Sequence, residues 1–216
     1  MNFYTSDQHL MHRNIIKYCD RPFDSVEHMD SEILRRWNDK VSQEDTVYVV
    51  GDFALGTNAK AKEWLSKANG RKVLIIGNHD NHPNAMREMG FDEVHYELIV
   101  EVKDEKWLLS HYPKNDDLLE GVDRLIHGHK HSGDTHSGKC LNICVDLHNF
   151  EPISEDKIYE LYPSHSRENP GHCSLSIADE RIIINADLSF DEFEGFVQSA
   201  KIKMREISQK KYKNEK

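Results

Sequence analysis

The sequence predicts a layered α/β protein with a mixed β-sheet. Short apolar, β-branched runs alternate with stretches of helical periodicity, and this alternation is typical of α/β layering. Two later strands follow each other without a helix between them, which indicates that the sheet is not purely parallel. Polar side chains follow five of the expected strands, at the place where ligand crevices lie in open α/β sheets.

The first half of the chain supplies three of these strands. A short strand at 1–6 leads into a loop and then a helix, for which Asp24 is the expected cap with Glu27 three residues on. Buried strands are predicted at 46–50 and 72–76, and each ends in a glycine followed by polar residues. The helical patterns between and after them are a short helix capped by Asn58 and a stretch at 83–89.

The second half contains shorter strands and a change of composition. The expected strands are those at 98–102, 107–110, 125–126 and 141–145. Two prolines punctuate the polar stretch 163–171, which is therefore a predicted linker. After it we expect a hairpin of 173–177 with 181–185 and an amphipathic helix from Phe190 with a basic tail. The predicted domains are 1–163 and a C-terminal ββα extension, 164–216.

Composition excludes several classes of protein. Hydrophobic residues make up 38% of the chain, and no apolar run approaches the roughly 20 residues needed to cross a bilayer. The N-terminus lacks the features of a secretory signal and the four cysteines form no CxxC pair, so we expect a cytoplasmic protein that binds no membrane. The net charge of −10 disfavours tight binding of duplex nucleic acid, which depends on a surplus of Lys and Arg.

Carboxylates, an amide and imidazoles follow the predicted strands. They are Asp7, His9, Asp52, Asn78, His79, His111, His129 and His131. Such side chains at the ends of rigid strands suit a site for two divalent cations, in which one carboxylate bridges the metals. Taken singly, each motif is weak, because a lone histidine at a strand end is more often structural than a ligand. Their joint occurrence in one order is specific.

These motifs, in this order, resemble the signature of the calcineurin-like metallophosphoesterase superfamily. The stretch 5–23, TSDQHLMHRNIIKYCDRPF, also resembles the opening of a small bacterial and phage branch of it. The matching elements are Asp7-Gln8-His9, Gly51-Asp52, Gly77-Asn78-His79-Asp80, His111 and Gly128-His129-Lys130-His131. The resemblance implies two facing mixed sheets flanked by helices, with the site along one edge of the sandwich. It also implies a metal-dependent phosphoesterase.

The resemblance assigns a role to each matching position. The first metal would be held by Asp7, His9, Asp52 and His131. The second would be held by Asp52 as the bridge, together with Asn78, His111 and His129. His79 is left as a catalytic residue that stabilises the transition state or protonates the departing oxygen, and Asp80 is expected to orient it.

Substrate contacts are less clear from the sequence. His12, Arg13 and Asn14 follow the first ligands and are candidates to contact the phosphate, although loop fixing is an equal alternative. For Arg21 a surface salt bridge is the preferred interpretation. We read His127 and His148 as supporting or packing residues, and Cys140 and Cys144 as core residues.

The sequence therefore predicts a phosphoesterase that uses a dinuclear metal centre on a small phosphate ester, with a phosphodiester favoured over a phosphomonoester. The alternatives are a catalytically silent metal-binding scaffold and a nuclease. Mn²⁺ is the favoured metal, and Fe, Ni or Zn also suits a mixed nitrogen and oxygen ligand set. A homo-oligomer formed through the C-terminal segment is left open.

Overall fold

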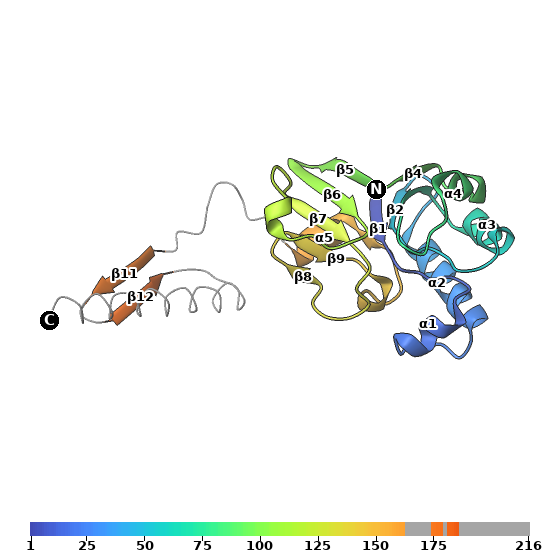
Figure 1. Cartoon of the computed structure of the whole chain (residues 1–216), viewed down its shortest axis with the longest axis horizontal. Coiled ribbons are helices and arrows are strands. Elements are labelled where there is room, and N and C mark those ends of the chain that lie inside the picture. Colours follow the sequence, from blue (N-terminus) through green and yellow to red (C-terminus); the bar gives the residue numbers. More distant parts are fainter. Residues whose placement is uncertain (163–173, 179–180, 186–216) are drawn as a thin grey trace. The chain divides into compact units, whose positions relative to one another are not determined.

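The computed structural model describes residues 1–162, 174–178 and 181–185. The chain divides into two compact units, Met1–Pro163 and Ser164–Lys216, and each is described by itself (Figure 1).

The first sheet of the larger unit has five strands in the order β10-β1-β2-β3-β4. Its members are β1 (Asn2–Thr5), β2 (Thr46–Val50), β3 (Arg71–Ile75), β4 (Glu93–His95) and β10 (Ile153–Ser154). The neighbours β1, β2, β3 and β4 are parallel, and β10 is antiparallel to β1. The carboxyl ends of β1, β2 and β3 therefore meet at one edge of this sheet.

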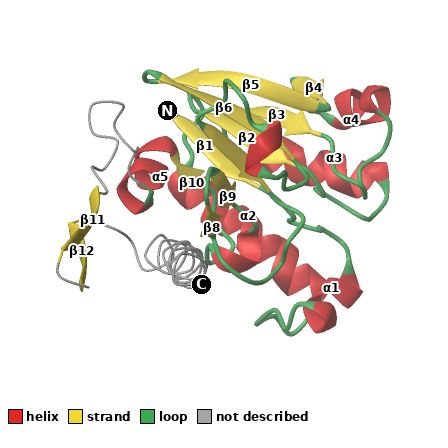
Figure 2. Cartoon of the chain, turned by 60° about the vertical axis from the view of Figure 1, so that its left-hand side comes forward, coloured by secondary structure: helices red, strands yellow, loops and turns green. Residues whose placement is uncertain are grey.

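Most helices of this unit pack on the outer face of the first sheet, whereas the last one, Glu155–Leu161, places Ile158 in the cluster between the two sheets. The helices of this unit are α1 (Arg13–Tyr18), α2 (Val26–Lys40), α3 (Asn58–Lys67), α4 (Pro83–Met89) and α5 (Glu155–Leu161). Because side chains alternate along a strand, Val47 and Val49 point to the helices and share a buried cluster with Trp37 of α2 and Trp64 of α3. In both views α4 lies next to α3 and β4 (Figures 1 and 2).

The second sheet also has five strands, in the order β5-β6-β7-β9-β8. They are β5 (Glu97–Val102), β6 (Glu105–Ser110), β7 (Arg124–His127), β8 (His136–Ser137) and β9 (Cys140–Asn142). β5 and β8 pair antiparallel with their neighbours, whereas β6, β7 and β9 run parallel. Two short 3-10 turns, η1 (Asp116–Leu118) and η2 (Val145–Leu147), complete the unit.

The two sheets face each other across a second apolar cluster. Tyr4 and Val50 leave the first sheet on the face opposite the helices and pack with Trp107, Leu109 and Ile126 of the second sheet. The predicted architecture of two facing mixed sheets flanked by helices is confirmed. One sandwich edge consequently collects the strand ends that carry the polar motifs.

Local details differ from the sequence-based expectations. Ser25 caps α2 through a 3.1 Å bond from the His28 N–H, in place of Asp24, and Thr57 caps α3 in place of Asn58. The strand expected at 141–145 ends at Asn142, and η2 begins at Val145. The short elements β4, β10 and α5 were not predicted.

In the second unit, β11 (Ser174–Ala178) pairs antiparallel with β12 (Arg181–Asn185), which is the expected hairpin. The predicted linker at 163–171 and the helix predicted from Phe190 lie outside the described residues. Among the described residues, no helix combines the length and the apolar character needed to span a bilayer.

Candidate metal centre

Asp52 lies at the middle of the converging strand ends. It follows β2 after Gly51, and its side chain is buried. One carboxylate oxygen, Oδ1, accepts a 2.9 Å hydrogen bond from the backbone N–H of His79. The other, Oδ2, is 3.5 Å from Nε2 of His9 and 3.5 Å from Nε2 of His111. A single oxygen thus faces imidazoles that come from two different sheets.

On one side of Asp52 lie Asp7, His9 and His131. Asp7 is fully buried, and its carboxylate accepts a 2.6 Å bond from Ser6 Oγ and bonds of 3.0 and 3.1 Å from the backbone N–H of His129. Nε2 of His131 is 3.7 Å from Asp7 Oδ1. The ring centroids of His9 and His131 are 5.1 Å apart.

On the other side lie Asn78, His111 and His129. Oδ1 of Asn78 is 3.1 Å from Nε2 of His111 and 3.1 Å from Nδ1 of His129. The Nδ1 atom of His111 is 3.0 Å from the Val50 carbonyl oxygen, so it carries the proton and donates it. This bond leaves Nε2 as the nitrogen with a free lone pair, which is the usual arrangement for a metal-binding histidine.

The donor set is suited to bind metal ions. The groups whose donor atoms all lie within 4.8 Å of one another include Asp7, His9 and Asp52, and separately Asp52, His111 and His129. These two groups share Asp52. Both ring nitrogens of His9 are buried and lack a hydrogen-bond partner, and burial lowers the pKa of His9 to about 3, so the ring is neutral at pH 7. A neutral imidazole beside buried carboxylates is suited to bind a cation.

The backbone around the centre is strained. Asp7, His9, Asp52 and His129 all have positive φ, between 49° and 69°. Each non-glycine residue in this region costs on the order of 1 kcal/mol, and such strain collects at functional sites. Gly51 also has a positive φ of 88°, and a Cβ there would overlap the ring of His111. The close packing of the strand ends therefore requires a glycine before Asp52.

His79 and Asp80 follow Asn78 but point in different directions. His79 is exposed, and its ring lies 5.3 Å from that of His9. The expected role of Asp80 in orienting His79 is not what the structure shows. Asp80 instead accepts hydrogen bonds from the N–H groups of Gly77 at 2.8 Å, Asp52 at 2.9 Å and Phe53 at 3.0 Å. Asp80 thus ties the two turns together, and burial raises its pKa despite these bonds.

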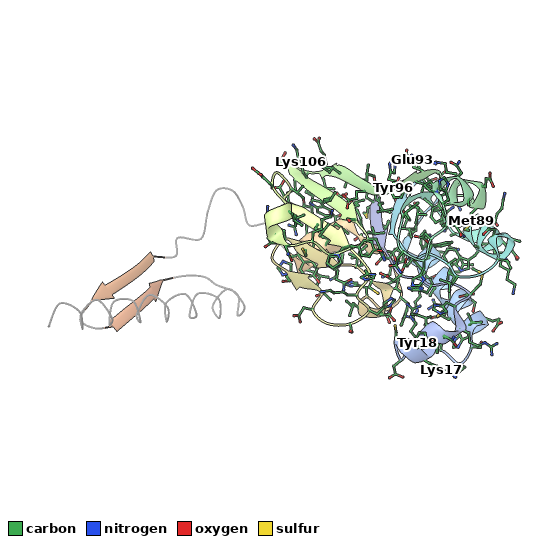
Figure 3. The ribbon with its side chains drawn as sticks, viewed as in Figure 1. Lys17, Tyr18, Met89, Glu93, Tyr96 and Lys106 are labelled. Carbon is green, nitrogen blue, oxygen red and sulfur yellow. The ribbon has the colours of Figure 1, made fainter. Side chains whose placement is uncertain are left out.

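The candidate substrate residues lie at the start of α1. The His12 ring is 5.5 Å from that of His9, and its Nδ1 atom is buried without a hydrogen-bond partner. The side chains of Arg13 and Asn14 are exposed and, within the described part of the chain, hydrogen-bond to none of the site residues. Lys17 and Tyr18 also lie on the outside of α1 (Figure 3). Only His12 of the three candidates reaches the centre.

Arg21 does not form the surface salt bridge that we expected. It is buried and pairs with Asp146, which in turn is 2.7 Å from Nδ1 of His131. No sequence motif includes Asp146, although a charged residue within the apolar stretch 143–147 is a usable signal. His127 and His148 bond to the carbonyls of Gly128 and Asn142 and belong to none of the donor groups.

Two curated proteins and one crystal structure are similar to the chain over most of their length. The uncharacterized protein MJ1445 of Methanocaldococcus jannaschii is 35% identical over 168 residues, which are 74% of this chain and 89% of that protein. The gene 66 protein of Mycobacterium phage L5 is 30% identical over 203 residues, 78% of this chain and 97% of that protein.

The crystal structure is that of AQ665 from Aquifex aeolicus, a protein of unknown function. It is 32% identical with a TM-score of 0.64, and the match covers 74% of this chain and 98% of that one. No family model matches the chain. The matches cover nearly the full length of both curated relatives. In the structure, the polar motifs meet at one edge of the sandwich. The chain belongs to one family with MJ1445 and the phage L5 gene 66 protein.

Proposed function

We propose that this protein is a phosphoesterase that depends on two divalent cations and hydrolyses a phosphodiester. The observation that carries the proposal is the position of Asp52 between two groups of donor atoms, Asp7 with His9 and His111 with His129. A shared carboxylate is the ligand that a dinuclear hydrolytic centre needs in order to hold two cations roughly 3.5 to 4 Å apart.

The proposed ligand assignment keeps the roles that the motif resemblance implies, and the contacts of His131 with Asp7 and of Asn78 with His111 and His129 support it. Asp7, His9 and His131 would hold one cation, whereas Asn78, His111 and His129 would hold the other, with Asp52 common to both. When bound, the metals would polarise the phosphate oxygens and lower the pKa of an attacking water. The neutral amide of Asn78 supplies an oxygen ligand without placing a further negative charge beside the phosphate.

The exposure of the donors supports a site that a small ester can reach. Asp7, His9, Asp52 and His111 are at most 2% exposed and form the floor. Asn78, His79 and His129 are exposed and form the rim. A buried floor fixes the donors rigidly, and an open rim admits the phosphate group.

His79 is the proposed proton donor to the leaving oxygen. Its ring lies beside His9 at the exposed rim, and it belongs to none of the donor groups found among the described residues. Its backbone N–H binds Asp52, so the residue is anchored by its main chain while its side chain stays free to contact substrate. His12, whose ring also lies beside that of His9, is the proposed substrate contact.

Metal removal tests the proposed function. Mn²⁺ is the proposed cation, since the mixed nitrogen and oxygen donors suit it, and Fe, Ni or Zn would also bind such a set. Chelation should abolish hydrolysis of bis-nitrophenyl phosphate, and added Mn²⁺ should restore it with two ions per chain by elemental analysis. Full activity of a chelated protein shown to contain no metal would contradict the proposal. Metal binding without hydrolysis of any mono- or diester would instead favour the silent scaffold.

A further inference from the structure

Arg21 and Asp146 form a buried ion pair directly behind the candidate metal centre. Arg21 Nε is 2.8 Å from Asp146 Oδ1, and Nη2 is 2.7 Å from Oδ2. The side chains are 0% and 6% exposed. Desolvating two charges costs several kcal/mol per ion, and a well-packed apolar pair often stabilises a fold equally well. Stability alone therefore gives little reason for an ion pair at this position.

The guanidinium also holds the strained loop that follows β1. Arg21 Nη2 donates to the carbonyl oxygen of Asp7 and Nη1 to that of Gln8, both at 2.8 Å. These two carbonyls lie between the Cα atoms of Asp7 and His9, whose φ values are 58° and 49°. Two hydrogen bonds from a buried cation thus stabilise a backbone conformation that is unfavourable by itself.

All five N–H groups of Arg21 point to an acceptor. Besides the two carbonyls and the two oxygens of Asp146, Nη1 lies 3.5 Å from the sulfur of Met29. The guanidinium has five N–H donors in a fixed fork, so none remains for a phosphate. Arg21 therefore acts on the site through other residues and does not bind the substrate.

The carboxylate of the same pair orients His131. Asp146 Oδ2 accepts a 2.7 Å bond from Nδ1 of His131. The proton therefore sits on Nδ1, and Nε2, which is 3.7 Å from Asp7 Oδ1, keeps its lone pair toward the centre. Burial raises the pKa of Asp146, but the bonds from His131 and Arg21 outweigh burial and keep it below the ordinary value.

We infer that the Arg21–Asp146 pair positions Asp7, His9 and His131 as one unit and thereby sets the affinity of the cation site that these residues form. The inference rests on the proposed function. The effect should be confined to this cation site, because the residues of the other site have different partners. His111 is oriented by the Val50 carbonyl, and Asn78 contacts His111 and His129. Within the described residues, neither member of the pair hydrogen-bonds to the side chains of the second group.

Mn²⁺ titration of the full chain tests the inference, with calorimetry and electron paramagnetic resonance as readouts. Asp146→Asn should weaken one of two Mn²⁺ sites by about 10- to 100-fold, the usual effect of removing a partner of a metal-binding histidine. The other site should keep its affinity. At an Mn²⁺ concentration that just fills both wild-type sites, the wild type should show the signal of a coupled pair of ions. The variant should show the signal of an isolated ion at the same concentration.

Two further variants keep the test decisive if Asp146→Asn folds poorly. Arg21→Lys retains the charge but has three N–H donors and no planar fork, so it cannot make all four bonds of Arg21 to the two carbonyls and the two carboxylate oxygens, and it should weaken the same site. The double variant Arg21→Met/Asp146→Leu removes both charges, so the fold is expected to persist. This double variant should also weaken only the cation site formed by Asp7, His9 and His131.

The Arg124–Glu105 pair supplies a matched control. Arg124 Nε is 2.6 Å from Glu105 Oε2, the side chains are 8% and 16% exposed, and Arg124 also donates to the Tyr162 carbonyl. Glu105→Gln and Arg124→Met/Glu105→Leu should leave both Mn²⁺ affinities unchanged.

Unchanged Mn²⁺ binding in the Arg21 and Asp146 variants would overturn the inference. So would an equal loss at both sites, or the same loss in the control variants. A wild-type chain that binds none of Mn²⁺, Fe²⁺, Ni²⁺ and Zn²⁺ would contradict the proposed function, and the inference with it. Cation binding by the wild-type protein therefore distinguishes failure of the proposed function from failure of the inference.

Discussion

Replacement of Asp52 by Asn is expected to empty at least one of the two cation sites and to lower turnover by more than about 10³-fold. The reason is that Asp52 Oδ2 faces both His9 and His111 at 3.5 Å, so one substitution removes the negative charge shared by both donor groups. The asparagine can still accept the 2.9 Å bond from the His79 N–H through Oδ1. The fold should therefore persist, which circular dichroism and thermal unfolding would check.

Asp134→Asn is a suitable control for the change of charge. Asp134 is exposed and lies three residues after His131, so the control alters the net charge of the chain without touching the donor groups. It should retain two metals per chain and full turnover. An Asp52→Asn protein that still binds two metals with wild-type affinity would show that Asp52 does not bridge them.

His79→Ala is expected to keep both metals and to lose turnover by about 10²- to 10⁴-fold, equivalent to about 3 to 5 kcal/mol of transition-state stabilisation. Metal is retained because the His79 side chain lies outside the donor groups, and its N–H bond to Asp52 does not depend on the ring. The loss should be small for nitrophenyl esters, whose leaving group needs no proton, and large for alkyl esters. Steady-state rates for both ester classes would measure the difference.

His82→Ala is the matched control for this variant. His82 is exposed three residues later, and the one hydrogen bond of its ring to a described residue is accepted by Nδ1 from the N–H of Asn84 at 3.4 Å. The control should behave as the wild type with both ester classes. Loss of metal from His79→Ala, or an equal loss of rate with both leaving groups, would be incompatible with a proton-donor role.

Sequence patterns located the elements that have a strong local signal. The strand at 46–50 is a β-branched run ending in glycine, and the helix at 83–89 begins with proline; both lie where they were expected. The short strands β4 and β10 have three and two residues, too few for any periodicity to show. Their formation depends on the neighbouring strand in the sheet, which local patterns do not contain.

In the candidate site, too, the sequence predicts some features and not others. Its donor residues occur in recognisable motifs, so their order in the sequence was enough to group them. The pairing of Arg21 with Asp146 joins residues 125 positions apart, and no motif contains both. Asp80 is next to His79 in the sequence, yet it bonds to backbone N–H groups because the turn after β3 directs it toward the turn after β2. Adjacency in sequence indicated the wrong partner.

Anomalous X-ray diffraction from crystals grown with Mn²⁺ would test the dinuclear centre most directly. The account predicts two peaks per chain, roughly 3.5 to 4 Å apart, with the Asp52 carboxylate in contact with both. Asp7, His9 and His131 should surround one peak, and Asn78, His111 and His129 the other. A single peak, or two peaks of which only one contacts Asp52, would contradict the central claim that this carboxylate is shared by two cations.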